Sequence, residues 1–376
     1  MEKIKIKSVS MTNFGKLDES YASMALKASS PIVETAPPDR ISEVYFSSFA
    51  PEALCGIDDP CATVAQEIGR KYPSFRASFR GPFKTGGEAL CSALENGLPP
   101  GREVLILACE KMTHMDASEA ALHLSNRVNP HDRAYGATLP ALGALVTRYY
   151  MSHYRVPYRA FHAVSVKNHR NALLNPRAQF HREIHERMVA KSPIVSDPLR
   201  RLHCAPITDG AVAVLLSRDE GDTFFRGWAR GRDTNLFQER KDIGRFLATS
   251  DASQKALAQS GTAPWEADVV EIHDAFSPFE LINLEEMGFY AMGDAWKALN
   301  DGELDINGRI AVNPSGGLKG RGHPIGACGL SSVVEVHEQL THTAGSRQHD
   351  PARLAMIQSA GGVSNESYVF IIDTAG

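Results

Sequence analysis

The sequence predicts an α/β protein made of two similar halves, the first of which is interrupted by an insert. Strand-like apolar runs alternate with amphipathic helices on both sides of residues 117–205. Residues 117–205 themselves are rich in His, Arg, Pro and Tyr, and carry only short helical stretches. In both halves the unusual residues lie in loops between a strand and a helix. With 376 residues, 43% of them hydrophobic, the chain can fill the cores of two or three domains.

The first half opens with residues 1–15, in which charged and aliphatic side chains alternate as in an edge strand. This start lacks the apolar core and the small-residue cleavage site of a secretory signal. Residues 41–49 predict a second strand, and the stretch after it ends in a helix over 62–72. Residues 103–112 (EVLILACEKM) form a continuous apolar run, which is typical of a strand buried on both faces.

Between the last two elements the sequence predicts a loop and then a helix over Thr85–Glu95. Thr85, followed three residues later by Glu88, is a capping-box pattern, so the helix is expected to begin there. The free N–H groups and the dipole of its first turn would direct positive charge at the loop around Phe83.

After the insert, regular patterns return. In order, they predict strands at 210–217 and 268–276, a helix at 277–289, a run at 306–318 that enters a Gly-rich turn, a helix at 326–340, and closing strands at 354–362 and 366–373. The second half therefore repeats the strand–loop–helix units of the first.

Composition excludes several classes of protein. The net charge of −4 argues against a generally basic nucleic-acid binder. No apolar run approaches about 18 residues, so no transmembrane helix or membrane partner is expected. The six cysteines form no CxxC pair and no cluster with zinc-ligand spacing, so we expect no metal site and a reducing compartment. Together these features predict a cytoplasmic protein.

Charge is uneven along the insert. Residues 148–205 contain 11 Lys or Arg against 3 Asp or Glu. A solvated surface is the usual meaning of such a run. The other interpretation is an electropositive surface for a small polyanion, such as a phosphorylated cofactor.

Two loops carry candidate active residues. In residues 313–329 (NPSGGLKGRGHPIGACG), glycines let the backbone approach a ligand, and Pro324 fixes the turn that presents His323. In residues 271–281 (EIHDAFSPFEL), His273 and Asp274 lie where a buried strand ends, the usual place for active groups in α/β folds. The alternatives are a glycine-rich turn with an incidental histidine and a histidine satisfied in the core.

At these motifs the sequence resembles the thiolase family. GGLKGRGHPIGACG is similar to the family's GGxxxxGHPxGA(S/T)G signature, with Cys328 in place of its Ser or Thr. HDAF resembles the HDCF motif of sterol-carrier-protein-type and archaeal thiolases. Further similar stretches are EKMTHMD (110–116), KNHRNALLNPRAQF (167–180) and SDPLRRLHCAPITDGAVAVLL (196–216).

The resemblance implies the thiolase fold: two duplicated αβαβα halves that form a five-layered core, with an inserted loop domain. The corresponding ranges are 1–116 and 206–222 for the N-terminal half, 117–205 for the loop domain and 223–376 for the C-terminal half. It also implies a tight homodimer and an acyl-CoA substrate whose nucleotide phosphates lie against the insert. Coenzyme A is then part of the substrate, and no cofactor is bound covalently.

The sequence departs from the thiolase pattern at the two cysteines of the mechanism. Aligning the first loop on TGGEAL places Phe83 where catalytic thiolases have the cysteine that takes the acyl group. A phenyl ring has no nucleophilic atom, so no acyl-enzyme can form there. Ala275 stands for the acid/base cysteine of HDCF, and Gln358 begins the loop that reads CxG in other thiolases. Cys91, eight residues after Phe83, lies in an apolar helix where burial is expected.

The remaining groups suit an enolate. By resemblance, His273 and His323 converge at the thioester oxygen with Asn313 near His323, and backbone N–H groups at Phe83 and Ala360 line a second oxyanion hole. Such donors stabilise the enolate of a thioester. The general base is not identified; Tyr135, Asp274 and Ser359 are the candidates.

Two functions remain open at the level of sequence. The first is an enzyme that makes or breaks the C–C bond next to a CoA thioester, as an aldol or retro-aldol lyase or as an atypical acyltransferase. The second is a non-catalytic subunit that binds acyl-CoA or supports a catalytic partner. The intact histidines favour the enzyme. By resemblance only, we also expect a small zinc-ribbon/OB-fold partner protein.

Overall fold

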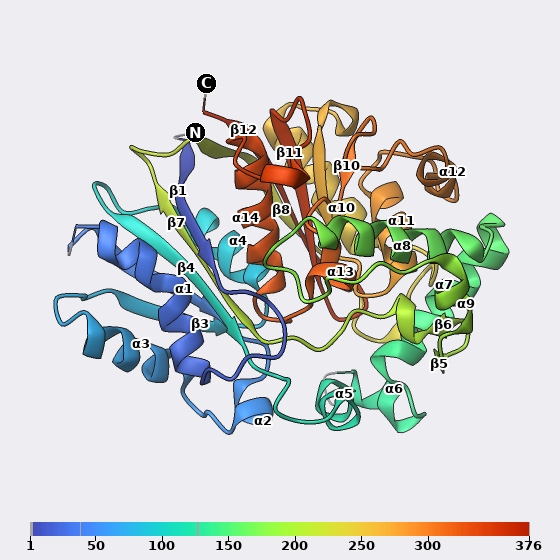
Figure 1. Ribbon diagram of the computed structural model, residues 1–376, viewed down its shortest axis with the longest axis horizontal. Coiled ribbons are helices and arrows are strands. Elements are labelled where there is room, and N and C mark those ends of the chain that lie inside the picture. The colour runs from blue at the N-terminus through green and yellow to red at the C-terminus, as the bar shows by residue number, and fades with distance from the viewer. Residues whose placement is uncertain (1–2, 38, 126–127, 376) are drawn as a thin grey trace.

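Ten of the described strands of the computed structural model form one mixed sheet in which the same arrangement occurs twice, and two further strands pair separately in the insert (Figure 1). The structure describes residues 3–37, 39–125 and 128–375, so the expected range limits at residues 1 and 376 lie outside it. The first half contains β1 (Ile4–Met11), β2 (Ile41–Ser47), β3 (Ser78–Phe83), β4 (Glu103–Glu110) and β7 (Gly210–Ser217). The second contains β8 (Thr223–Arg232), β9 (Val269–Ile272), β10 (Ala311–Val312), β11 (Leu354–Gly361) and β12 (Glu366–Thr374).

The two halves share strand order and strand direction. The first runs β3-β2-β4-β7-β1 and the second runs β10-β9-β11-β12-β8. In each, the first two pairings are parallel and the next two are antiparallel. An antiparallel pairing of β1 with β8 joins the halves. The predicted duplication is therefore present in the topology itself.

Side-chain alternation along the strands builds the layers. In β4 and β7, alternate residues belong to two different apolar clusters, so each face of this half-sheet is covered. The outer cluster packs under α1 (Tyr21–Thr35) and α3 (Pro60–Lys71). The inner cluster contains α4 (Gly86–Asn96) and α14 (Cys328–Leu340) together with strands of both halves.

The second half-sheet and the helices on its outer face form the remaining two layers of the core. Residues of β11 and β12 alternate between the inner cluster and a third cluster. That third cluster includes side chains of α10 (Leu247–Ser260) and α11 (Ser277–Glu286). The order is helix, sheet, helix pair, sheet, helix, which is the predicted five-layered α/β core, and α4 and α14 are its central layer.

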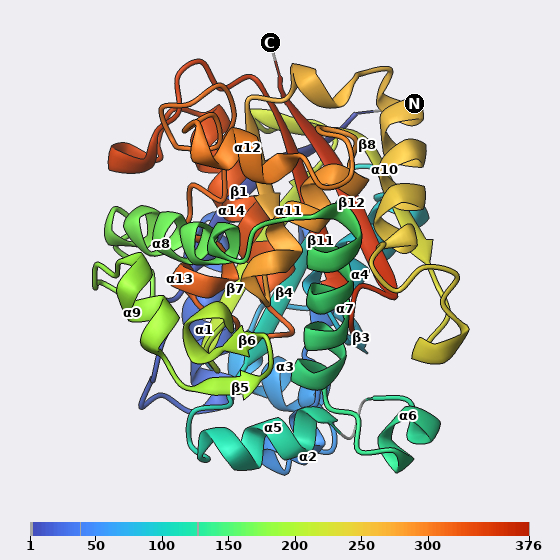
Figure 2. The ribbon, with the colours of Figure 1, turned by 90° about the vertical axis from the view of Figure 1, so that its right-hand side faces the viewer.

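The insert follows β4 and returns at β7, where the second half has only the short β11–β12 turn. It contains α5 (Ala117–Ser125), α6 (Pro130–Ala134), α7 (Leu139–Tyr154), α8 (Arg159–Leu173), α9 (Glu186–Lys191), β5 (Ile194–Ser196) and β6 (Leu199–Arg200). Figure 2 shows α7 and α8 on the side of the second half that carries α11. The expected loop-domain range, 117–205, falls within this span, except that residues 126–127 are not among those described.

Several predicted elements need correction. The first strand is central, because β1 lies between β7 and β8, and Ile4 and Ile6 are buried. A lysine at position 7 suggested a strand with one face in water. In the structure the Lys7 ammonium pairs with Glu103 and Glu220, so the charge is compatible with a central strand. Residues 78–83, expected as loop, form the edge strand β3, whose exposed residues show no apolar alternation.

The strand expected over 268–276 ends at Ile272, so His273 and Asp274 follow it rather than belong to it. Similarly, the run at 306–318 contributes only the two-residue β10 and then the short helix α13 (Gly317–Arg321). The remaining short helices are α2 (Pro51–Cys55) and α12 (Ala295–Asn300). Among the described residues, every helix is too short or too polar to cross a bilayer.

Candidate functional site

Two histidines meet at the carboxyl ends of the second half's strands. His273 follows β9 directly, and His323 follows α13 after the turn at Gly322. Their ring centroids are 5.2 Å apart and the ring planes are at 85°. The structure therefore brings together the two loops that the sequence singled out.

A third segment, residues 204–208, runs between these loops and joins them. The Ala205 N–H donates to the carbonyl of Ala275 at 2.9 Å. The N–H of His323 donates to Oγ1 of Thr208 at 2.8 Å. Cys204 and Ile207 make isolated β-bridges to the two motifs. Residues 204–208, at the end of the insert, thus connect the loop of His273 to the loop of His323.

Both imidazoles are neutral near pH 7. Burial, and to a lesser extent the charge of Arg321, lowers the pKa of His273 to about 4. The pKa of His323 is also well below its ordinary value, because of burial, then His273 and then Arg321. Among the described residues, Nδ1 of His323 is buried without a hydrogen-bond partner. A neutral imidazole can donate one N–H to a developing oxyanion and keep a lone pair on the other nitrogen.

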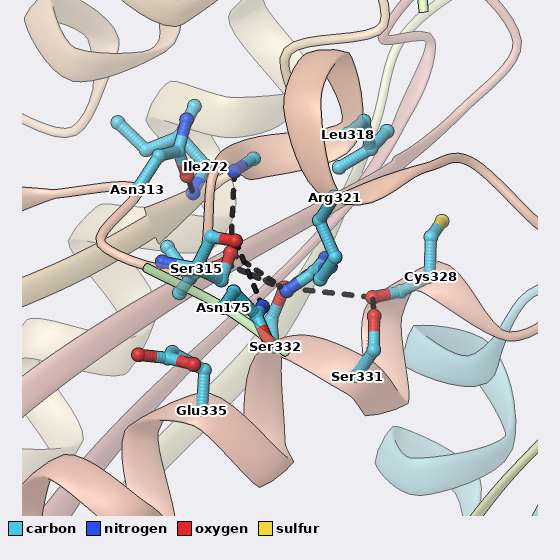
Figure 3. A network of polar contacts seen from close by, with 12 residues as sticks. Asn175, Ile272, Asn313, Ser315, Leu318, Arg321, Cys328, Ser331, Ser332 and Glu335 are labelled. Atoms are coloured by element: carbon cyan, nitrogen blue, oxygen red, sulfur yellow. Dashed lines mark hydrogen bonds and ion pairs between the residues drawn. The ribbon is translucent and has the colours of Figure 1, made fainter. Parts of the chain in front are cut away.

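Arg321 also holds the glycine-rich loop (Figure 3). Its guanidinium is buried, and Nη1 donates to Oε2 of Glu271 at 3.0 Å and to Oγ of Ser315 at 2.9 Å. Ser315 in turn donates its N–H and its hydroxyl to the Glu271 carboxylate. This charge-assisted network fixes the start and the end of the turn that leads to His323.

Asn313 has a different environment from the one expected. Its Oδ1 accepts the N–H of Ile272 at 2.8 Å, and its Nδ2 donates to Oε2 of Glu280 at 2.7 Å. The residue is buried in a left-handed conformation with φ of 51°. Its side chain therefore ties β9 to α11, and these contacts give no support to a catalytic role beside His323.

Phe83 ends β3, and its half-buried ring stacks on Tyr45 with centroids 5.9 Å apart and an interplanar angle of 11°. Its carbonyl accepts the N–H of Ser48 at 2.9 Å, and the neighbouring Ser47 hydroxyl donates to the carbonyl of Gly326 at 2.8 Å. The end of β3 and the turn after His323 are therefore linked through β2. The predicted helix start is confirmed, since Thr85 caps α4 by accepting from the N–H of Glu88.

Glu110 is a buried carboxylate at this junction that the sequence reasoning missed. Its Oε2 accepts the N–H of Phe49 at 2.8 Å and the N–H of Gly326 at 2.9 Å. Burial raises its pKa to about 7, although these hydrogen bonds oppose the rise. In the sequence, the one feature that could have identified Glu110 is that it ends an otherwise apolar strand.

The loop expected to supply Gln358 and Ala360 is the end of β11. Oε1 of Gln358 accepts the backbone N–H of His273 at 3.0 Å, and its Nε2 donates to Thr249 and Ser367. Gln358 thus helps to hold His273 in place. Ala360 is buried and pairs with Ser367 in β12. The oxyanion holes at Phe83 and Ala360 remain predictions.

The candidates for a general base differ in their surroundings. Tyr135 is 82% exposed, so its hydroxyl lies outside any buried site. Asp274 is fully buried and accepts from the N–H of Leu318 and the amide of Asn168, which makes it a structural group. The hydroxyl of Ser359 is buried without a partner among the described residues, beside Gly87 and Gly329.

The thiols are poor nucleophiles in this structure. Cys91 is buried in α4, and burial raises the pKa of its thiol to about 12, with Glu95 adding to the rise. Burial also raises the pKa of Cys204, which makes a β-bridge to Phe276, to about 11. A thiol needs a lowered pKa to react readily. Across the described residues, no group of three His, Cys, Asp or Glu side chains is arranged to hold a metal ion.

Comparison with known proteins agrees with this architecture. Residues 229–374 match the family model for the thiolase C-terminal domain-like region. The chain is 34% identical to the acetyl-CoA acetyltransferase of Methanothermobacter thermautotrophicus, over 99% of both chains. It is 31% identical to sterol carrier protein 2 of Rattus norvegicus, over 74% of this chain and 54% of that protein. Among solved structures, the Ltp2-ChsH2(DUF35) aldolase matches with a TM-score of 0.79 at 21% identity, covering 99% of this chain and 98% of that one. The duplicated five-layered fold and the full-length similarity show that the chain belongs to the thiolase superfamily.

Proposed function

We propose that this chain is an enzyme that makes or breaks the C–C bond next to an acyl-CoA thioester through an enolate, without a cysteine acyl-enzyme. The observation that carries the proposal is the combination of two histidines whose rings are in contact and whose pKa values are lowered, a buried His273 and a half-buried His323, with a phenylalanine at position 83. We place Phe83 where catalytic thiolases carry their nucleophile. Ala275 and Gln358 likewise take the places of the acid/base cysteines, so both thiols of the thiolase mechanism are lost.

Retro-aldol cleavage of a 3-hydroxyacyl-CoA is the reaction that fits these groups. A base removes the β-hydroxyl proton, the C–O bond becomes a carbonyl, and the Cα–Cβ bond breaks. Its electron pair becomes the thioester enolate, which the N–H groups of His273 and His323 stabilise in a low-dielectric site. Protonation at Cα then yields the shortened acyl-CoA and a free aldehyde or ketone. The aldol direction uses the same groups in reverse.

The neutral state of the histidines matters for this chemistry. An imidazolium beside the thioester would need to be charged in a buried site, where the pKa of His273 is about 4. A neutral imidazole supplies its N–H without that cost. The similarity to a solved aldolase of this fold supports the reaction class, while the similarity to acetyl-CoA acetyltransferases supports acyl-CoA as the ligand.

The proposal includes an assembly. We expect a homodimer, and we expect the coenzyme A phosphates to lie against the basic insert. The solved aldolase carries a DUF35 protein in its name, which supports the expected small zinc-ribbon/OB-fold partner.

A second candidate function is a non-catalytic acyl-CoA-binding subunit. It is favoured by the stacking of Phe83 on Tyr45, which places the ring against the core of the first half, and by the exposure of Tyr135. In that case the histidines would contribute to packing and ligand binding only.

Incubation with a 3-hydroxyacyl-CoA, followed by chromatography of the CoA products, separates the two functions. The proposal predicts a shortened acyl-CoA and an equal amount of aldehyde or ketone, with release falling by roughly 100-fold or more in His323→Ala, as for other oxyanion-hole donors. His342→Asn is a matched control, because His342 is exposed beyond the far end of α14 and has a left-handed φ of 55° that asparagine tolerates. Binding of acyl-CoA without release by the wild type, in the presence of the partner, would favour the non-catalytic subunit.

A further inference from the structure

One face of α8 contacts the loops that carry the histidines, although α8 belongs to the insert. Lys167, Asn168 and Asn171 lie on α8, and Asn175 lies just beyond its end. Spacings of three, four and eight residues place such side chains on a common helix face. All four are buried, and buried polar groups need hydrogen-bond partners.

Three of these side chains donate to backbone carbonyls of the segment 312–315. Lys167 Nζ donates to Val312 at 2.7 Å, Asn171 Nδ2 to Asn313 at 3.0 Å, and Asn175 Nδ2 to Ser315 at 2.9 Å. A Cβ at Gly316 would lie 2.7 Å from Cβ of Ala172, so α8 lies directly against this loop. The glycines of the GGLKG run therefore make room for the insert helix.

Asn168 makes the contacts that reach the catalytic loops. Its Nδ2 donates to Oδ2 of Asp274 and to Oε2 of Glu280, both at 2.7 Å. Its Oδ1 accepts from Lys167 Nζ at 2.7 Å. Both N–H groups of the Asn168 amide and its oxygen are therefore engaged in hydrogen bonds.

Asp274 then joins the two histidine loops. It is the residue after His273, and its Oδ1 accepts the N–H of Leu318 in α13 at 2.6 Å. A Cβ at Gly317 would lie 2.6 Å from Oδ2 of Asp274, so the carboxylate sits directly against the α13 backbone. This one carboxylate thus ties the loop of His273 directly to the loop of His323, in addition to the contacts of residues 204–208 and of Glu271.

We propose that Asn168 is a positioning residue for the proposed reaction: by holding the Asp274 carboxylate against α13, it sets the relative placement of His273 and His323. The insert that is expected to bind coenzyme A thereby sets the geometry of the histidine pair. Asn168 touches no reacting atom; it acts through Asp274.

The charges around Asn168 explain why an amide is needed there. Asp274 and Glu280 are two buried carboxylates, and the cations that face them are Lys167, 3.1 Å from Oε1 of Glu280, and Lys319 of α13. Burial, and then the nearby Glu280, raises the pKa of Asp274 above its ordinary value, while the hydrogen bonds from Leu318 and Asn168 oppose the rise. One neutral amide that donates to both carboxylates holds them together without adding charge.

The test compares Asn168→Ala with Ser165→Ala. Ser165 is equally buried on α8, and its hydroxyl bonds Ser277 at the start of α11 at 2.7 Å rather than Asp274 or α13. For Asn168→Ala we expect kcat for 3-hydroxyacyl-CoA cleavage to fall by roughly 10- to 100-fold with KM changed by less than about threefold, because misplacement of a catalytic group by about 1 Å has effects of this size. For Ser165→Ala we expect kcat to stay within about twofold.

A readout that needs no turnover separates this proposal from the proposed function. Imidazole NMR signals of His273 and His323, assigned with alanine variants, should titrate at low pH in the wild type and in Ser165→Ala. In Asn168→Ala the pKa values of both histidines should rise toward the usual value of about 6.5, because the loosened loops admit water, which lowers the cost of charging a buried imidazole. If the wild type cleaves no CoA ester, these titrations still show whether Asn168 positions the two histidines. If Asn168→Ala does not fold, Asn168→Ser, which keeps one donor, takes its place.

Unchanged kcat and unchanged histidine titrations in a folded Asn168 variant would overturn the proposal. Equal loss of kcat in Ser165→Ala would also overturn it, since the effect would then be a general loss of stability. A double-mutant comparison with Asp274→Asn adds a further check. If the two residues act as a unit, the double variant should lose no more than the worse single variant.

Discussion

Buried carboxylates define this site as much as the histidines do. Glu110, Asp274 and Glu271 each accept a backbone N–H group from the loop of residues 313–329 that carries His323. Each such contact fixes a backbone position that glycine-rich loops do not hold by themselves. The placement of the proposed catalytic histidines therefore depends on carboxylates outside the histidine pair.

Glu110 gives a prediction at this scale. With a pKa raised to about 7 in the folded protein and about 4.5 when unfolded, the folded state binds its proton more tightly. Wild-type stability should therefore fall as pH rises from about 4.5 to about 7, and Glu110→Gln should lack this loss. A glutamine can keep its oxygen on Phe49 and Gly326 and donate to the Ser48 hydroxyl.

The measurement is urea unfolding of both proteins at pH 4.5 and pH 8. Relative to wild type, Glu110→Gln should gain roughly 3 kcal/mol between these values, since one pKa unit corresponds to about 1.4 kcal/mol. Other buried acids are common to both proteins and cancel. A stability difference that is independent of pH would show that Glu110 is ionised in the fold as it is in the unfolded chain.

At this scale the sequence singled out His273, His323 and Phe83, because each stands in a distinctive local pattern, and the structure brings the two histidines together. It did not locate the partners. Glu110 bonds Gly326 across 216 positions of the chain, and Gln358 bonds His273 across 85. No local pattern encodes such pairs, since only the fold brings them together. For Asn313, the family resemblance implied a place near His323, and the structure shows its amide joining β9 and α11.

At the scale of elements, the central helix pair depends on glycine. A Cβ at Gly86 would lie 2.9 Å from both N and Cγ of Leu330, and one at Gly329 would lie 2.7 Å from Oγ of Ser359. Helix α4 therefore meets α14 with backbone close to backbone. The first turns of both helices lie next to the loops of Phe83 and His323, so this crossing also positions the site.

Gly86→Ala should destabilise the protein by about 1–3 kcal/mol, because the added methyl overlaps backbone that cannot move away. Gly69→Ala in α3 is the matched control. A Cβ there has no neighbour within 4 Å, and alanine in a helix is favoured over glycine by up to about 1 kcal/mol. Thermal unfolding of both variants checks the pair, and a stabilised Gly86→Ala would refute the tight crossing.

Elements with strong patterns were predicted well and elements without them were not. The buried runs of β4 and β7 and the capped helix α4 follow their patterns. The edge strand β3 was missed because exposed strands need no apolar alternation, and Gly81 and Pro82 suggest a turn. The first strand was predicted at an edge because Lys7 suggested exposure to water. The acids that pair with Lys7 come from other elements, so the local sequence does not reveal them.

At the scale of the whole molecule, duplication explains where the site lies. Equivalent helices, α4 and α14, follow equivalent strands, β3 and β10, and meet at the centre of the stack. The loops before them therefore converge, one bringing Phe83 and the other His323. The sequence suggested two similar halves, but the matching strand order could be seen only once the pairings were known.

The central claim is that no substrate fragment becomes attached to this chain during its reaction. Intact-protein mass spectrometry tests it, after incubation with acetyl-CoA and with a 3-ketoacyl-CoA under reducing conditions and an acid quench. Phe83→Cys serves as the control, because it restores a thiol at the position that we align with the nucleophile. The account predicts an unchanged mass for the wild type and an added acyl group on the introduced thiol of the variant, located by peptide mapping. An acyl group on the wild-type chain, on Cys91, Cys204 or any other residue, would contradict it.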